Sequence, residues 1–255
     1  MSEPFVNILR DGDVATVELN RPDANNGVSP DMTNAIGAAL RELETDDRAK
    51  VVVLTGKGRM FSAGGNLGAL VAGLPTRDLD LERRNLWEAH SMIGYLLHYP
   101  KPTIARINGP AAGGGLAYAL ACDRRIASEK AKLVYAYGLI GLSGDLGVNW
   151  LISRLIGAGK GRAFAFSPGA DGRQALQIGL VDEVAAPDAL DAAVARSADY
   201  MRKIPSFAAN EIKRNLETAA TIGFTEMAEM ESASFQRCRG SEDHRLALEA
   251  LLNGK

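Results

Sequence analysis

Alternating apolar and polar positions dominate the start of the chain. Two β-rich segments, Val6–Arg10 and Val14–Leu19, flank the turn Asp11-Gly12-Asp13 and predict a hairpin. Ser29 and Pro30 then supply a capping side chain and a proline at the first helical position. Apolar residues recur at helical spacing after this start, so a helix is predicted that ends near residue 46.

A unit made of a strand, a glycine-rich loop and a helix occurs twice. The apolar, β-branched run Val51–Thr55 predicts a buried strand, and a glycine-rich loop (56–65) and a short helix from Asn66 follow it. The run Thr103–Ile107 predicts a second strand, followed by a loop (108–115) and a helix of small residues that ends at Cys122. The repeat predicts an α/β fold in which each glycine loop connects the end of a strand to the start of a helix.

The remainder of the chain changes from mixed elements to helices alone. We expect a helix at 81–98, strands at 123–127 and 132–135, and no strand after about residue 187. The last helices expected are Ala189–Arg202, Ser206–Ala219 and Phe224–Arg239. This change predicts a core with the active site at 1–200 and a helical region at 201–255.

Composition excludes several classes of protein. The chain has 255 residues, 46% of them hydrophobic, and its 29 basic and 31 acidic residues give a net charge of −2. A nucleic-acid binder needs a strongly basic surface, so nucleic acid is not an expected partner. No apolar run approaches the ~18 residues that a membrane span needs, and the N-terminus does not have the pattern of a secretory signal. Cys122 and Cys238 form no metal-binding motif. We therefore expect a cytoplasmic protein without a membrane partner or a metal.

The two glycine loops predict a binding site for a negatively charged oxygen. A strand that ends in glycines before a helix leaves several amide N–H groups unpaired, and two such loops across a cleft would aim two amides at one oxygen. Either loop alone could instead serve only close packing. The first loop (56–61) lacks the third small residue of a dinucleotide fingerprint, and the chain has no Walker loop.

The loop sequences resemble those of the enoyl-CoA hydratase/isomerase (crotonase) superfamily. The matching stretches are Gly56-Lys-Gly-Arg-Met-Phe-Ser-Ala-Gly-Gly-Asn-Leu67 and Lys101-Pro-Thr-Ile-Ala-Arg-Ile-Asn-Gly-Pro-Ala-Ala-Gly-Gly-Gly-Leu116. Leu19-Asn-Arg-Pro22 and Gly179-Leu-Val-Asp-Glu-Val184 are also typical of that family. The resemblance implies a crotonase-type spiral of ββα units with a C-terminal helical region used in trimerisation.

The resemblance also implies a substrate and residues that bind it. The substrate would be an acyl-CoA thioester, with no cofactor beyond the coenzyme A that it carries, and the assembly a homotrimer or a dimer of trimers. The oxyanion donors would be the amides of Gly65 and Gly114. The coenzyme A pocket would be lined by Gly114 and by the stretch Ala63, Gly64, Gly65, Asn66, Leu67 and Gly68.

The reaction depends on side chains around the acyl carbons. The positions of the two glutamates that hydratases of this family use are here Ala117 and Tyr137. Alanine cannot transfer a proton, and tyrosine is a poor base near neutral pH, since its unperturbed pKa is about 10. Asp145 occupies the position where isomerases and dehalogenases of the family keep an aspartate. It could instead cap a helix that begins at Leu146.

His90 matches the water-activating histidine of the dehalogenase-like members, whose tryptophan is replaced here by Tyr137. Both residues are therefore candidate catalytic residues. A single carboxylate favours double-bond isomerisation, or a related rearrangement, with Asp145 as proton shuttle. One alternative is a hydrolytic reaction like that of 4-chlorobenzoyl-CoA dehalogenase, using Asp145 and His90. Another is a non-catalytic scaffold that binds coenzyme A.

Overall fold

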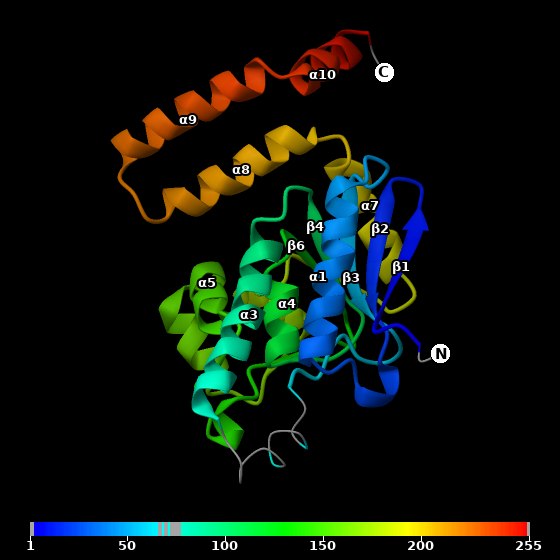
Figure 1. Ribbon diagram of the computed structural model, residues 1–255, viewed down its shortest axis with the longest axis vertical. Coiled ribbons are helices and arrows are strands. Elements are labelled where there is room, and N and C mark those ends of the chain that lie inside the picture. Colours follow the sequence, from blue (N-terminus) through cyan, green and yellow to red (C-terminus); the bar gives the residue numbers. More distant parts are fainter. Residues whose placement is uncertain (1–2, 66–67, 69–70, 72–77, 254–255) are drawn as a thin grey trace.

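A six-stranded sheet forms the centre of the protein (Figure 1). The structure is a computed structural model that describes residues 3–65, 68, 71 and 78–253. Strand β1 pairs antiparallel with β2, as the predicted hairpin requires, and every later pairing in this sheet is parallel. Its strands, in spatial order, are β1 (Val6–Asp11), β2 (Val14–Leu19), β3 (Val51–Gly56), β4 (Thr103–Ile107), β6 (Arg124–Ser128) and β9 (Glu183–Ala185).

Helices bury both faces of this sheet, which explains why β3 is apolar at consecutive positions. Val52 and Leu54 belong to the larger core cluster, formed with α1 (Pro30–Thr45), α3 (Leu79–Leu97) and α4 (Gly114–Leu120). Val51 and Val53 point to the opposite face and pack against α7 (Leu190–Met201). The predicted start of α1 is confirmed, because the Ser29 side chain accepts a hydrogen bond from the Met32 amide.

A second, three-stranded sheet was not predicted. It consists of β5 (Ala111–Ala112), β7 (Lys132–Val134) and β8 (Ala170–Asp171), in the order β5-β7-β8. Strand β5 lies inside the second glycine loop and pairs parallel with β7. The segment after β7 leads through a 3₁₀ turn, η3 (Gly138–Ile140), to α5 (Val148–Ala165), and α6 (Gly172–Ile178) follows β8. The small sheet therefore ties the second glycine loop to the segment that carries Tyr137 and Asp145.

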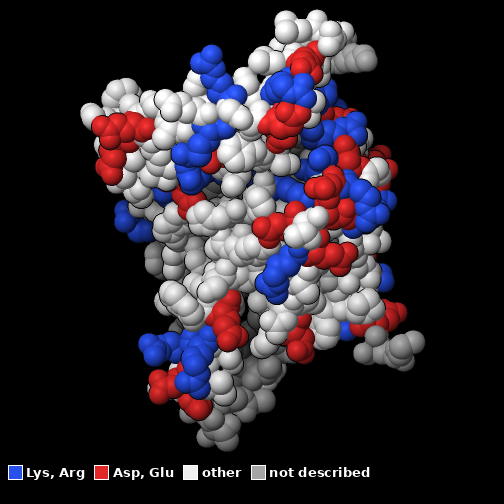
Figure 2. Space-filling model, turned by 45° about the horizontal axis from the view of Figure 1, so that its top comes forward, with Lys and Arg blue, Asp and Glu red and all other residues white. Residues whose placement is uncertain are grey.

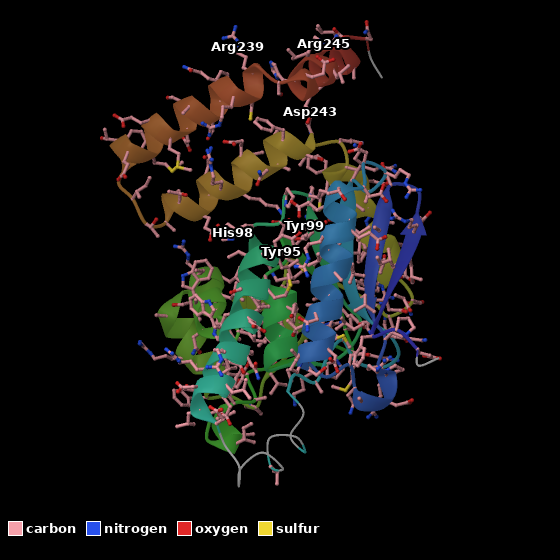
Figure 3. The ribbon with its side chains drawn as sticks, in the orientation of Figure 1. Tyr95, His98, Tyr99, Arg239, Asp243 and Arg245 are labelled. Carbon is pink, nitrogen blue, oxygen red and sulfur yellow. The ribbon has the colours of Figure 1, made fainter. Side chains whose placement is uncertain are left out.

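The last three helices, α8 (Ser206–Ala219), α9 (Phe224–Arg239) and α10 (Glu242–Leu252), extend away from the sheet (Figure 1). The bounds of α8 and α9 agree with the prediction, whereas α10 was not expected. Lys213 on α8 donates to the carbonyl oxygens of Tyr99 and Lys101 and pairs with Asp123 at 2.6 Å. Figure 3 labels Tyr99 at the end of α3 that lies next to α8. These polar contacts fasten α8 to the core.

The surface shows no field of one sign on the face seen in Figure 2, where basic and acidic side chains are interspersed. None of the helices in the described ranges is both long and apolar enough to cross a membrane.

Candidate active site

Buried side chains hold the first glycine loop in place. The Asn26 side chain donates from Nδ2 to the carbonyl oxygens of Lys57 and Met60, both at 3.0 Å, and accepts from the Arg21 amide. The Ser62 hydroxyl donates to the Asn26 carbonyl oxygen at 2.7 Å and accepts from the Gly64 amide at 3.2 Å. The loop is therefore fixed before any ligand binds.

The two glycine loops contact each other through their backbones. The Ala112 amide donates to the Ser62 carbonyl oxygen at 2.9 Å, and Ser62 and Ala111 form a parallel bridge. Gly64 has a φ of 79°, and a Cβ atom there would lie 2.5 Å from the Ala112 carbonyl oxygen and 3.1 Å from the Gly114 nitrogen. Only glycine permits this approach, which brings Gly65 and Gly114 into neighbouring backbone segments.

The amides of Gly65, which is exposed, and Gly114, which is buried, have no hydrogen-bond acceptor among the described residues. Neither donates a hydrogen bond to any part of the chain that the structure describes. The neighbouring Gly113 amide is already engaged by the Val134 carbonyl oxygen at 3.2 Å, and Gly114 is the first residue of α4. Two free N–H groups on adjacent fixed segments suit the oxyanion hole predicted from the sequence. Their roles in catalysis stay predictions.

Part of the predicted coenzyme A pocket can be located. Ala63 is half-buried, and its amide donates to the Asn25 carbonyl oxygen at 2.9 Å. Gly65 and Gly68 are exposed. Asn66 and Leu67 lie outside the described residues.

Asp145 lies beside the second glycine loop. Its side chain accepts a hydrogen bond of 2.5 Å from the Tyr137 hydroxyl, and that hydroxyl lies 3.7 Å from where a Cβ of Gly113 would be. The next residue, Leu146, reaches to 2.7 Å from the equivalent position on Gly114. Asp145 thus directly precedes a residue that packs on Gly114, and its carboxylate accepts a hydrogen bond from a residue that packs on Gly113.

The capping role considered for Asp145 is wrong. Helix α5 begins at Val148, two residues later than expected, and its N-cap is Gly147, with no side-chain hydrogen bond. Asp145 contributes only its backbone carbonyl, which accepts from the Val148 amide at 3.0 Å. Its carboxylate is therefore directed at Tyr137 rather than at the helix.

Tyr137 acts as a hydrogen-bond donor in this arrangement. Burial, reinforced by the neighbouring Asp145 charge, raises the pKa of Tyr137 well above its usual range. The phenol therefore stays protonated and is a poor general base at neutral pH, and its participation in catalysis stays a prediction. Ala117, at the other glutamate position, is fully buried on α4.

His90 is half-buried on α3 and bonds to its own helix. Its Nδ1 lies 2.6 Å from the Leu86 carbonyl oxygen. Because a carbonyl can only accept, Nδ1 is the donor, which leaves Nε2 as the acceptor of the neutral ring. No hydrogen bond or ion pair joins His90 to Asp145 or Tyr137 within the described ranges. The proposed participation of His90 stays a prediction.

The sequence did not single out Tyr135 and Asn149, which hold the segment before Asp145. The Tyr135 hydroxyl lies 2.5 Å from the Ser143 carbonyl oxygen and 2.7 Å from Oδ1 of Asn149. The available signal was weak: a tyrosine two residues before Tyr137 and an amide four residues after Asp145.

Other reactive groups do not extend the site. Burial raises the pKa of the Cys122 thiol to about 12, so this cysteine is no nucleophile at neutral pH. Among the described residues, no three His, Cys, Asp or Glu side chains come together as a metal site. The groups that the candidate site offers for chemistry are therefore two amides, one carboxylate and one phenol, and their catalytic roles stay predictions.

Comparisons of the whole chain with known proteins show what it is similar to. The family model described as enoyl-CoA hydratase/isomerase matches residues 10–253. The 1,2-epoxyphenylacetyl-CoA isomerase of Escherichia coli is 30% identical, over 94% of this chain and 92% of its own. The 4-chlorobenzoyl coenzyme A dehalogenase-2 of an Arthrobacter species is 29% identical, over 86% of this chain and 80% of its own.

A solved structure confirms the expected crotonase-type fold. The crystal structure of an enoyl-CoA hydratase from Polaromonas sp. JS666 superposes with a TM-score of 0.91, at 27% identity, over 98% of this chain and 97% of that one. The three relatives carry the names of three different reactions, so they establish a family rather than a reaction. The chain belongs to the enoyl-CoA hydratase/isomerase family.

Proposed function

We propose that this protein is an acyl-CoA isomerase that moves a double bond, or carries out a related rearrangement, by proton transfer. The observation that carries the proposal is the position of Asp145, which accepts from Tyr137 and precedes the residue that packs on Gly114. A carboxylate beside the oxyanion loop can reach the carbons next to a thioester carbonyl bound there.

In the proposed reaction a single proton leaves one carbon of the acyl chain and returns to another, so nothing is gained or lost overall. The Asp145 carboxylate removes a proton from Cα of a 3-enoyl-CoA, and the electron pair of that bond moves into the thioester carbonyl. The amides of Gly65 and Gly114 stabilise the resulting dienolate oxygen. The Asp145 carboxylic acid returns the proton to Cγ, the Cα–Cβ bond becomes double, and the product is a 2-enoyl-CoA.

A panel of 3-enoyl-CoAs incubated in deuterated water tests the proposal. We expect conversion to the 2-enoyl isomer, followed by its ultraviolet absorbance, with deuterium incorporated at Cα or Cγ. Mass spectrometry of the recovered thioesters distinguishes the alternatives. A wild-type protein that gives neither exchange nor a new product with any acyl-CoA would favour the non-catalytic scaffold.

Hydration of simple 2-enoyl-CoAs should be poor. Because Ala117 and Tyr137 stand where hydratases use glutamates, no pair of carboxylates can activate water and deliver a proton. We expect crotonyl-CoA to be hydrated at least about 10²-fold more slowly than a 3-enoyl-CoA is isomerised, since each acid–base group contributes on this order. Efficient formation of the 3-hydroxy product, in the same preparation that isomerises the control substrate, would contradict this expectation.

The dehalogenase-like reaction is the second candidate. His90 supports it, because its Nδ1 is held by the Leu86 carbonyl oxygen, so Nε2 is the ring nitrogen left to activate water. The Tyr137 bond to Asp145 counts against it, since a carboxylate that accepts a strong hydrogen bond is a weaker nucleophile. Incubation with 4-chlorobenzoyl-CoA and intact-protein mass spectrometry separates the two candidates. An aryl adduct on Asp145 would support the dehalogenase, and a proton shuttle forms no adduct.

We further propose that the protein assembles as a homotrimer or a dimer of trimers. Helices α9 and α10 expose Phe224, Phe235, Leu251 and Leu252, each at least 67% accessible. Large apolar side chains exposed on projecting helices indicate a surface that a partner covers. We expect light scattering at micromolar concentration to give the mass of a trimer or hexamer, and a stable monomer would contradict the proposal.

A further inference from the structure

The backbone is strained on both sides of the segment that carries Asp145. The Tyr137 amide donates to the Tyr135 carbonyl oxygen at 2.9 Å, which closes a γ-turn centred on Ala136. Ala136 has a φ of 64°, the strained form of this turn. Leu146, directly after Asp145, has a φ of 51°. Non-glycine residues rarely occupy this region, and such strain is found at positions where a site is pre-organised.

The γ-turn places two tyrosines side by side and gives their hydroxyls different partners. The ring centroids of Tyr135 and Tyr137 are 5.1 Å apart, and the ring planes meet at 67° in an edge-to-face arrangement. The Tyr137 hydroxyl reaches Asp145, whereas the Tyr135 hydroxyl reaches Ser143 and Asn149. The pair therefore contacts two points of the same following segment.

The side chains of Tyr135 and Asn149 contact the backbone of Ser143 and Gly144, just before Asp145. The Asn149 side chain donates from Nδ2 to the Ser143 carbonyl oxygen at 2.9 Å. A Cβ atom on Gly144 would lie 2.6 Å from the Tyr135 hydroxyl and 2.9 Å from Nδ2 of Asn149. The backbone at Ser143 and Gly144 is thus contacted by two side chains from outside the segment.

These contacts matter because the segment 138–147 would otherwise have little to restrict its backbone. It contains four glycines in ten residues (138–147), and three of them have positive φ, namely Gly141, Gly144 and Gly147. Glycine restricts the backbone little. A catalytic carboxylate must be held within about 0.5 Å of its productive position, so such a segment needs support from fixed side chains.

We propose that Tyr135 and Asn149 are positioning residues that hold Asp145 in place through the Ser143 carbonyl, with the γ-turn at Ala136 presenting Tyr135 to it. The inference rests on the proposed role of Asp145 as proton shuttle. Tyr135 acts through the backbone of the segment, and its hydroxyl is assigned no contact with the substrate.

The main test replaces Tyr135 with phenylalanine, which keeps the ring and removes the hydroxyl. We expect kcat for 3-enoyl-CoA isomerisation to fall about 10-fold to 10²-fold, because displacing a reacting group by about 1 Å has an effect of this order. KM should change less than about two-fold, since the amides of Gly65 and Gly114 are untouched. Hydrogen exchange in peptides covering 138–147, measured by mass spectrometry without substrate, should become faster.

The matched control is Tyr99→Phe. Tyr99 is also buried, and its hydroxyl also donates to a backbone carbonyl, that of Leu40, at 2.8 Å. It lies at the end of α3 next to α8 (Figure 3). Loss of the Tyr99 hydroxyl should lower the melting temperature without changing kcat or the hydrogen exchange of residues 138–147. Asn149→Ala is a second test of the contacts that Tyr135 and Asn149 make with Ser143. In log kcat, the double variant with Tyr135→Phe should lose less than the sum of the two single losses.

The outcomes separate this inference from the proposed function. If Tyr135→Phe and Asn149→Ala keep wild-type kcat and wild-type exchange in 138–147, the positioning role is wrong. A fall in kcat without faster exchange would also overturn it, because the effect would not pass through the segment. If wild-type protein turns over no acyl-CoA, the proposed function fails. Hydrogen exchange in residues 138–147 of the variants then still decides whether Tyr135 and Asn149 restrain this segment.

Discussion

Replacing Asp145 with asparagine should lower isomerase turnover by on the order of 10²-fold or more, because the amide cannot carry a proton from one carbon to another. The exchange of Cα and Cγ protons with deuterated solvent should fall in parallel. Asparagine has the same size, and its Oδ1 can still accept from the Tyr137 hydroxyl. Because Asp145 does not cap α5, the melting temperature should change little. Affinity for the coenzyme A ester, measured by calorimetry, should survive.

Asp171→Asn provides the matched control for this change. Asp171 caps α6, accepting from the Gln174 amide at 2.8 Å, and asparagine caps about as well as aspartate. This variant should keep both activity and stability. An Asp145→Asn protein that is folded and fully active would show that the proton travels by another group.

Replacing Gly114 with proline should reduce turnover by about 10²–10³-fold, the usual effect of losing one oxyanion-hole donor. Proline removes the N–H group outright. The backbone at this position suits proline, because Gly114 is the first residue of α4, where proline is well accommodated. The preceding Gly113 has a ψ of −125°, outside the α region that a following proline disfavours.

Gly114→Ala separates the lost donor from the added bulk. Both variants place a Cβ atom against Leu146, whose Cδ1 would be 2.7 Å away, so both push on the residue after Asp145. Only proline removes the amide hydrogen. We expect the alanine variant to retain most of the activity and the proline variant to lose it, with melting temperatures measured for both. A folded proline variant that keeps as much activity as an active alanine variant would place the oxyanion hole elsewhere.

Local patterns determined most of the secondary structure before any contact was known. The bounds of β4, α8 and α9 follow from runs of apolar residues and their spacing, because these features depend on neighbours within a few residues. Ser29 and Pro30 likewise mark the start of α1, since a cap acts within one turn. The two glycine loops were recognisable for the same reason, as each is a strand end followed by a helix start.

Elements that exist only through long-range contacts could not be read from the chain. Strands β5 and β8 have two residues each, too few to show a period, and they form because β7 lies between them. The first turn expected at Leu146 is displaced to Val148, since Leu146 is held at positive φ while its side chain packs against Gly114. Helical spacing does not report such constraints.

The sequence by itself determined which groups are available for catalysis: glycine amides in two loops, an aspartate at position 145, and no glutamates at 117 and 137. Only the tertiary structure decided how they are arranged. It brought Gly64 against Ala112, turned the Asp145 side chain toward Tyr137 instead of a helix end, and placed Tyr135 and Asn149 against Gly144. The physical reason is that residue type sets the chemistry of each group, whereas the distances between groups depend on packing among segments far apart in the chain.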